Sequence, residues 1–168
     1  VIGRDSEGYY NGMLDDVRLY DRAVTPDELT NIYNIKTETN LLLRYDFEQI
    51  DYSAGKVYDE SGNANTGTII NKETLNEDFT KDIGEYAVSG TAFKPDVDQY
   101  ISIPANYYNE VQGTNLENCT MTAWVKTDKL NSFEPIIHKE GVFSFGLKYG
   151  HAMLQLGDGT YLHTLPAI

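Results

Sequence analysis

The stretch from Tyr10 to Val24 constrains the fold more than any other part of the chain. Within it, Val17 to Tyr20 alternates apolar and polar residues, which is typical of a strand with one buried face. The next four residues, Thr25-Pro26-Asp27-Glu28, have the spacing of a capping box, with proline at the first helical position. We therefore expect a strand that ends near Tyr20 and a short helix over residues 26–33.

The rest of the chain indicates an all-β protein, because short apolar runs alternate with turn-forming residues. Residues 41–48 alternate in the manner of a half-buried strand, and residues 120–126 and 136–156 contain further strands, the later ones separated by glycines. A chain of 168 residues suits one domain with a sizeable core. The residues expected to be mostly buried are Leu43, Tyr45, Phe47, Met121, Val125, Phe143, Phe145 and Leu154.

Several of these runs resemble laminin-G-like domains of the concanavalin A-like jelly-roll class. The closing motif of that family reads roughly Gly-x-Ile/Leu-Asp-Asp/Glu-Val-Arg-Ile/Leu-Tyr-x-Arg-Ala, and residues 12–23 are similar to it. Residues 43–48 resemble the family's opening strand, residues 59–67 its Asp-x-Ser-Gly-Asn signature, and residues 120–126 its Thr-Ile-Ser-Ala-Trp-Val-Lys strand. The resemblance implies an antiparallel two-sheet jelly-roll sandwich with one short helix.

The order of these motifs differs from that of the family. The closing motif comes first, and the family's middle strands are absent, so we divide the chain into a closing strand and helix over 1–34, a linker over 35–40 and a front part over 41–168. One arrangement is a cut from a tandem array. The other is a permuted or strand-swapped unit, in which Met13 to Tyr20 runs antiparallel to Leu41 to Glu48. Open sheet edges could then pair with neighbouring jelly-roll domains or identical chains.

The resemblance also implies a structural calcium site. Asp59 and Asn63 lie in a turn-rich loop, and the family places this loop beside the closing motif, here Asp15 and Asp16. Carboxylate, amide and backbone carbonyl oxygens are the ligands that Ca²⁺ prefers. The alternative is that Asp59 and Asn63 only stabilise an Asx turn, while Asp15 and Asp16 are solvated charges.

Composition narrows the range of partners. A formal net charge of −13 argues against nucleic acid and against anionic membrane surfaces. No apolar segment approaches the roughly 20 residues of a membrane span, so we expect no membrane insertion. The single cysteine, Cys119, excludes an internal disulfide framework and fits a small buried position. We expect a piece of a longer secreted or cell-surface protein.

Two classes of function stay open. The fold resemblance favours a carbohydrate-binding accessory module of a secreted, bacterial glycoside hydrolase or related protein. The motif order favours a structural or adhesive repeat of a surface protein or fibre. A core position suits the lone Trp124 better than a sugar-stacking one, and the three histidines share no metal-ligand spacing. The tyrosines that could line a sugar groove are Tyr9, Tyr10, Tyr107 and Tyr108.

Motifs for catalysis are missing from the sequence. It contains neither the Glu-x-Asp-x-x-Glu run of jelly-roll glucanases nor a Gly-x-Ser-x-Gly nucleophile elbow. We therefore interpret the chain as non-catalytic.

Overall fold

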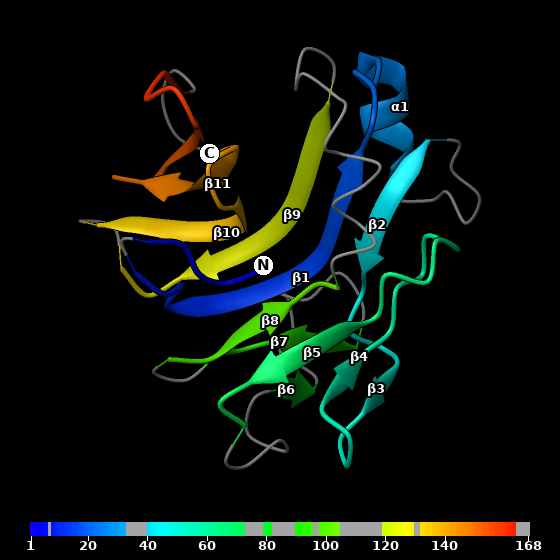
Figure 1. Cartoon of the computed structure of the whole chain (residues 1–168). Coiled ribbons are helices and arrows are strands. Elements are labelled where there is room, and N and C mark those ends of the chain that lie inside the picture. Colours follow the sequence, from blue (N-terminus) through cyan, green and yellow to red (C-terminus); the bar gives the residue numbers. More distant parts are fainter. Residues whose placement is uncertain are drawn as a thin grey trace.

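The computed structural model describes residues 1–6, 8–32, 40–72, 79–81, 90–95, 98–104, 119–129 and 132–163. Within these residues the chain is an all-β protein whose strands pair antiparallel, with one short helix (Figure 1). The first sheet contains β2 (Leu41–Tyr45), β1 (Gly12–Tyr20), β9 (Thr120–Thr127), β7 (Thr91–Phe93) and β6 (Phe79–Lys81).

Two further sheets of four strands form the second layer. One contains β3 (Ile50–Asp51), β4 (Lys56–Val57), β5 (Gly67–Ile70) and β8 (Tyr100–Ser102). The other contains β10 (Phe133–Lys139), β11 (Phe143–Lys148), β12 (His151–Leu156) and β13 (Tyr161–His163).

β1 is a central strand of the first sheet, and in Figure 1 it lies between β9 and β2. Val17 to Tyr20 pairs antiparallel with Leu41 to Tyr45, which confirms the predicted pairing over these residues. On its other edge the same strand pairs antiparallel with β9. The register with β9 shifts between Asp15 and Arg18, where Asp16 has a positive φ of 45°. This is the geometry of a β-bulge, and aspartate tolerates it better than most residues.

Ile2 joins the two four-stranded sheets into one layer. Its N–H donates to the carbonyl oxygen of Ile101 at 2.9 Å, and its own carbonyl accepts from the N–H of Ile101 at 2.9 Å. On its other side Ile2 bridges to Ile137, and the N–H of Gly3 donates to Ile136 at 2.9 Å. The beginning of the chain therefore lies between β8 and β10 as a short strand segment.

The core lies between the two layers and draws on both. From the first sheet it buries Leu14, Val17, Leu19, Leu43 and Tyr45, from the segment after β2 Phe47, and from the second layer Ile2, Val57, Ile69, Ile101, Ile137 and Phe143. Of the residues predicted to be buried, Leu43, Tyr45, Phe47 and Phe143 are buried, and Met121, Phe145 and Leu154 pack partly buried against this core.

The prediction for Val125 was wrong, because its side chain is 37 % exposed. Val125 pairs with Leu14, which is fully buried on β1. Burial thus declines from the central strand to β9, the outer strand of this part of the sheet.

The helix α1 (Pro26–Asn31) begins where the capping box predicted it. The hydroxyl of Thr25 accepts from the N–H of Glu28 at 3.2 Å, and the Glu28 carboxylate accepts from the N–H of Thr25 at 2.7 Å. The expected helix end at Tyr33 and most of the linker over 35–40 lie outside the described residues. In the part of the chain that the structure describes, no helix is long and apolar enough to span a membrane.

Candidate functional site

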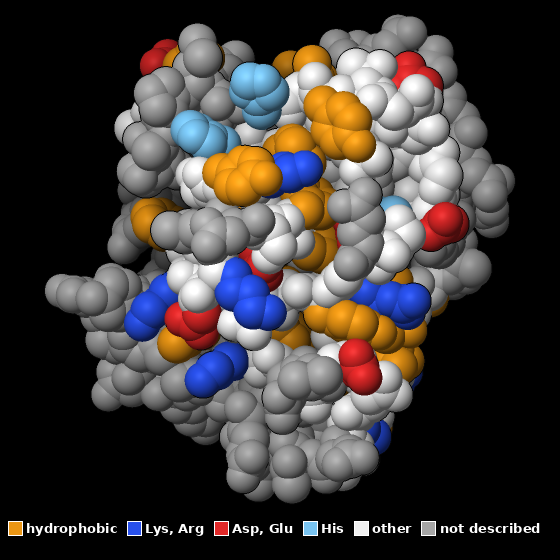
Figure 2. All heavy atoms as spheres, turned by 90° about the vertical axis from the view of Figure 1, so that its left-hand side faces the viewer, with side chains coloured by type: hydrophobic (Ala, Val, Ile, Leu, Met, Phe, Trp, Pro, Cys, Tyr) orange, Lys and Arg blue, Asp and Glu red, His pale blue; other side chains and the backbone are white. Residues whose placement is uncertain are grey.

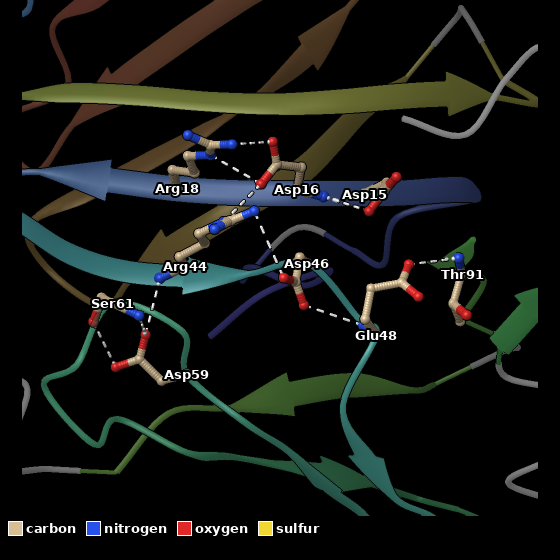
Figure 3. Close-up of polar contacts among 9 residues, drawn as sticks. All are labelled: Asp15, Asp16, Arg18, Arg44, Asp46, Glu48, Asp59, Ser61 and Thr91. Atoms are coloured by element: carbon tan, nitrogen blue, oxygen red, sulfur yellow. Dashed lines mark hydrogen bonds and ion pairs between the residues drawn. The ribbon is translucent and has the colours of Figure 1, made fainter. Parts of the chain in front are cut away.

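Asp16 lies in the bulge of β1 and binds two arginines (Figure 3). Its carboxylate accepts from Nε and Nη2 of Arg18 at 2.9 and 2.6 Å, and from Nε of Arg44 on β2 at 3.2 Å. Asp16 and Arg18 are both buried. Two buried charges that meet in this geometry compensate each other's loss of hydration, and removing either would leave the other with less compensation.

Asp59 organises the loop after β4 through four hydrogen bonds. Its Oδ1 accepts from the backbone N–H groups of Arg44 and Ser61, both at 3.0 Å. Its Oδ2 accepts from the Ser61 hydroxyl at 2.8 Å and from the N–H of Asn65 at 3.0 Å. Asn63 points its amide nitrogen at a carbonyl oxygen of β2 at 2.7 Å. Asp59 and Asn63 thus stabilise the turn, as one of the two interpretations of this loop expected.

Arg44 connects the two halves of the predicted calcium site. Its backbone N–H bonds to Asp59, while its guanidinium bonds to Asp16, so the two carboxylates approach the same residue from opposite sides (Figure 3). Asp15 accepts the N–H of Asp16 at 2.7 Å. Asp15 and Asp16 are buried, so the alternative interpretation that they are solvated charges was wrong.

In this arrangement the four residues do not fit a calcium ion shared by both motifs. Asp16 already faces two guanidinium groups, and each oxygen of Asp59 already accepts two protein hydrogen bonds. Among the described residues, no group of three or more His, Cys, Asp or Glu side chains is placed to hold a metal ion. A bound Ca²⁺ would require Arg44 to leave Asp16, and the calcium site stays a prediction.

Trp124 is on the surface, so the prediction of a core position was wrong. Its side chain is 50 % exposed, and it pairs across the sheet with Asp15. Its strand neighbour Ala123 packs against the core instead, because successive residues of a strand point to opposite faces. Sequence periodicity identified the two faces of β9 but assigned the tryptophan to the wrong environment.

Besides Trp124, several other large apolar side chains are exposed. Among the described residues, the large exposed hydrophobic side chains on β9, β13 and the turn after β11 are Trp124, Val125, Tyr149, Tyr161 and Leu162. Figure 2 views the side that carries β10 and β11 in Figure 1, and hydrophobic side chains gather near its middle.

The tyrosines proposed for a sugar groove have different surroundings. Tyr10 is buried in the core. Tyr9 packs beside Arg4, whose guanidinium carbon lies 5.6 Å from the ring centroid. Tyr107 and Tyr108 lie outside the described residues.

A polar pocket of about 200 Å³ lies on the face of β10–β12. His138, Ser144 and Gln155 form one row across these strands, because His138 pairs with Ser144 and Ser144 pairs with Gln155. Asp5, from the segment before β1, extends the row, and its Oδ2 accepts the hydroxyl of Ser144 at 3.0 Å. Asp5 and Ser144 are only 6 % and 4 % exposed. The bottom of the pocket is therefore formed by buried polar side chains that hydrogen-bond to each other.

A histidine and two charged residues, Glu140 and Lys139, also line the pocket. The Nε2 atom of His138 lies 3.2 Å from the carboxylate of Glu140. Nδ1 of His138 is buried without a hydrogen-bond partner among the described residues. Lys139 also lines the pocket, and burial lowers the pKa of its ammonium group. The site can therefore both donate and accept hydrogen bonds to a small polar ligand.

Sequence reasoning missed this pocket and the arginine pair. Asp5 and Ser144 are 139 residues apart, so no motif spacing connects them. Arg18 and Arg44, by contrast, stood at polar positions of two strands that were expected to pair. Register alone could have placed them opposite each other, as the structure does.

No known family, no curated protein and no solved structure matches this chain. The all-β architecture and the contacts above therefore rest on the chain's own structure. The likeness to laminin-G-like domains and the jelly-roll connectivity stay predictions.

Proposed function

We propose that this chain is a non-catalytic carbohydrate-binding module of a secreted or cell-surface protein. The observation that carries the proposal is the polar pocket, where an imidazole, a hydroxyl and an amide lie in one row beside a buried carboxylate. Sugar hydroxyls donate and accept hydrogen bonds at once, so a set of mixed donors and acceptors suits them.

The size and charge of the pocket indicate which class of sugar ligand it suits. Its volume of about 200 Å³ is below the roughly 300–1,000 Å³ of pockets for drug-sized ligands, which favours a single sugar unit over a long chain segment. Among the described residues, Asp5 and Glu140 line it together with one cation, Lys139, and the whole chain carries a formal charge of −13. These charges favour neutral sugars over anionic ones.

The proposal predicts saccharide binding that depends on the pocket. We expect a glycan array followed by titration calorimetry to find a neutral saccharide ligand. Gln155→Ala and His138→Ala should each weaken its binding by roughly 2–13-fold, since each removes a hydrogen bond worth about 0.5–1.5 kcal/mol.

Trp124→Ala is the matched control, because Trp124 is exposed on β9, outside the pocket lining. It should leave the affinity unchanged. A chain that binds no saccharide, or one whose binding is lost in Trp124→Ala and kept in the pocket variants, would contradict the proposal.

A further inference from the structure

Two histidines and a methionine belong to one face of the hairpin of β12 and β13. His163 pairs directly with Met153, and His151 is two residues before Met153 on the same strand. Because alternate residues of a strand point to the same face, all three side chains share that face. Directly opposite residues have Cβ atoms about 4.5–5.5 Å apart, and aromatic or long side chains also reach their diagonal neighbours. The register therefore allows both imidazoles and the thioether to reach a common ligand.

The turn between the two strands holds this register. The N–H of Leu156 donates to the carbonyl oxygen of Thr160 at 2.8 Å, and the N–H of Gly159 donates to the carbonyl oxygen of Leu156 at 2.9 Å. Within the turn, the Asp158 carboxylate accepts the N–H of Thr160 at 2.8 Å. A slip of one residue would send His163 to the opposite face. The hairpin thus presents the three side chains together before any ligand binds.

His151 has a buried nitrogen atom that an ion could satisfy. Its Nδ1 is buried, with no hydrogen-bond partner among the described residues. An unsatisfied buried polar atom is costly, and an ion is one of the partners that explain such an atom. With the proton on Nε2, Nδ1 carries a lone pair, and neutral imidazole is the commonest metal ligand in proteins. Met153 is only 7 % exposed, so its thioether sulfur offers a second ligand that is shielded from water.

We propose that His151, Met153 and His163 bind one copper(I) ion. A thioether is a soft ligand that selects Cu(I), and imidazole also suits copper. The set contains no carboxylate or carbonyl oxygen, which Ca²⁺ and Mg²⁺ require, and no thiolate, which structural Zn²⁺ sites favour. Lys148 pairs with His151, and its ammonium lies 6.0 Å from the centroid of the Tyr149 ring, where the aromatic face compensates part of its charge. The inference does not depend on sugar binding.

Titration with Cu(I) in a Cys119→Ala background tests the site. The background removes the single thiol of the chain, which could bind Cu(I) itself. Under anaerobic conditions, with ascorbate as reductant and a chromogenic Cu(I) chelator as competitor, the chain should hold one Cu(I). We expect His151→Gln, Met153→Leu and His163→Gln each to weaken binding roughly tenfold or more. Met121→Leu is the matched control, because Met121 packs against the core from β9, and it should leave the affinity unchanged.

NMR of the methionine methyl groups provides the second measurement. Cu(I) is diamagnetic, so one equivalent should shift the methyl signal of Met153 and leave those of Met13 and Met121 in place. Circular dichroism checks that all variants stay folded. A chain that holds no Cu(I) against the chelator, an unmoved Met153 signal, or equal weakening by Met121→Leu would overturn the proposal. Tighter binding of Zn²⁺ than of Cu(I) would overturn it as well, since the thioether would then contribute nothing to the choice of metal.

Discussion

Asp16 combines a left-handed backbone with a buried charge. Its φ of 45° shapes the bulge of β1, and its carboxylate holds Arg18 and Arg44. Asn tolerates the same backbone but lacks the charge, so Asp16→Asn isolates the ionic contribution. We expect this variant to lower the free energy of unfolding by roughly 3 kcal/mol, because the buried Arg18 would lose its ion pair with Asp16.

Urea denaturation at neutral pH measures this loss. Asp46→Asn is the control, since Asp46 lies 3.6 Å from Arg44 and its side chain is 21 % exposed. It should cost less than about 1 kcal/mol. Equal losses in both variants would mean that burial of the Asp16 pair contributes nothing.

The calcium hypothesis is tested at the same residues. If Ca²⁺ displaces Arg44 and bridges Asp16 to Asp59, the ion stabilises the fold by mass action, by about 2.7 kcal/mol at a hundredfold excess over Kd. The melting temperature should then rise with millimolar Ca²⁺ over EDTA in the wild type and stay level in Asp59→Ala. Since Asp59→Ala also loses hydrogen bonds, only the difference between the two conditions counts. A wild type that melts at the same temperature in both would end the hypothesis.

At the scale of single elements, local sequence patterns predicted where the helix begins and where the strands lie. They did not predict which side chains of those elements are buried. The capping box placed the start of α1, and alternation placed β1 and β2, because spacing along the chain determines both. The exposure of Trp124 and Val125 could not be predicted in this way. Alternation shows which residues share a face, but not whether another strand or layer covers that face.

The helix α1 adds a pH-dependent element. Hydrogen bonds from Arg22 and from the N–H of Thr25 lower the pKa of Glu28 from 4.5 to about 2. A carboxyl with a lower pKa in the folded than in the unfolded chain stabilises the fold fully above about pH 4.5, and this contribution is lost as the pH falls towards 2. NMR titration of the Glu28 carboxyl carbon should show the lowered midpoint, together with loss of α1 amide protection over the same range.

Glu28→Gln should remove that step in amide protection, whereas Asp27→Asn, one residue away in the same turn, should retain it. A Glu28 midpoint near 4.5 would contradict the capping-box geometry as the cause.

At the scale of the whole molecule, Ile2 has a larger role than its place in a short segment suggests. It is fully buried and bridges β8 to β10, so both halves of the second layer contact it. Ile2→Ala should lower the free energy of unfolding by about 2–5 kcal/mol through lost packing and a residual cavity. Leu29→Ala, on the exposed face of α1, should change it by less than about 0.5 kcal/mol. Chemical denaturation of the two variants measures both changes. If Ile2→Ala left the free energy of unfolding almost unchanged, the two four-stranded sheets would hold together without this side chain.

The central position of β1 also has a consequence for synthesis. Its neighbour β9 lies far along the chain, and the contact between Asn11 and Thr127 spans 116 residues. At about 5–20 residues per second, a ribosome needs roughly 6–23 s to make that span. During this interval the apolar face of β1 has emerged without the strand that pairs with its other edge. Such non-local pairing slows folding and leaves the nascent segment open to aggregation or to chaperones.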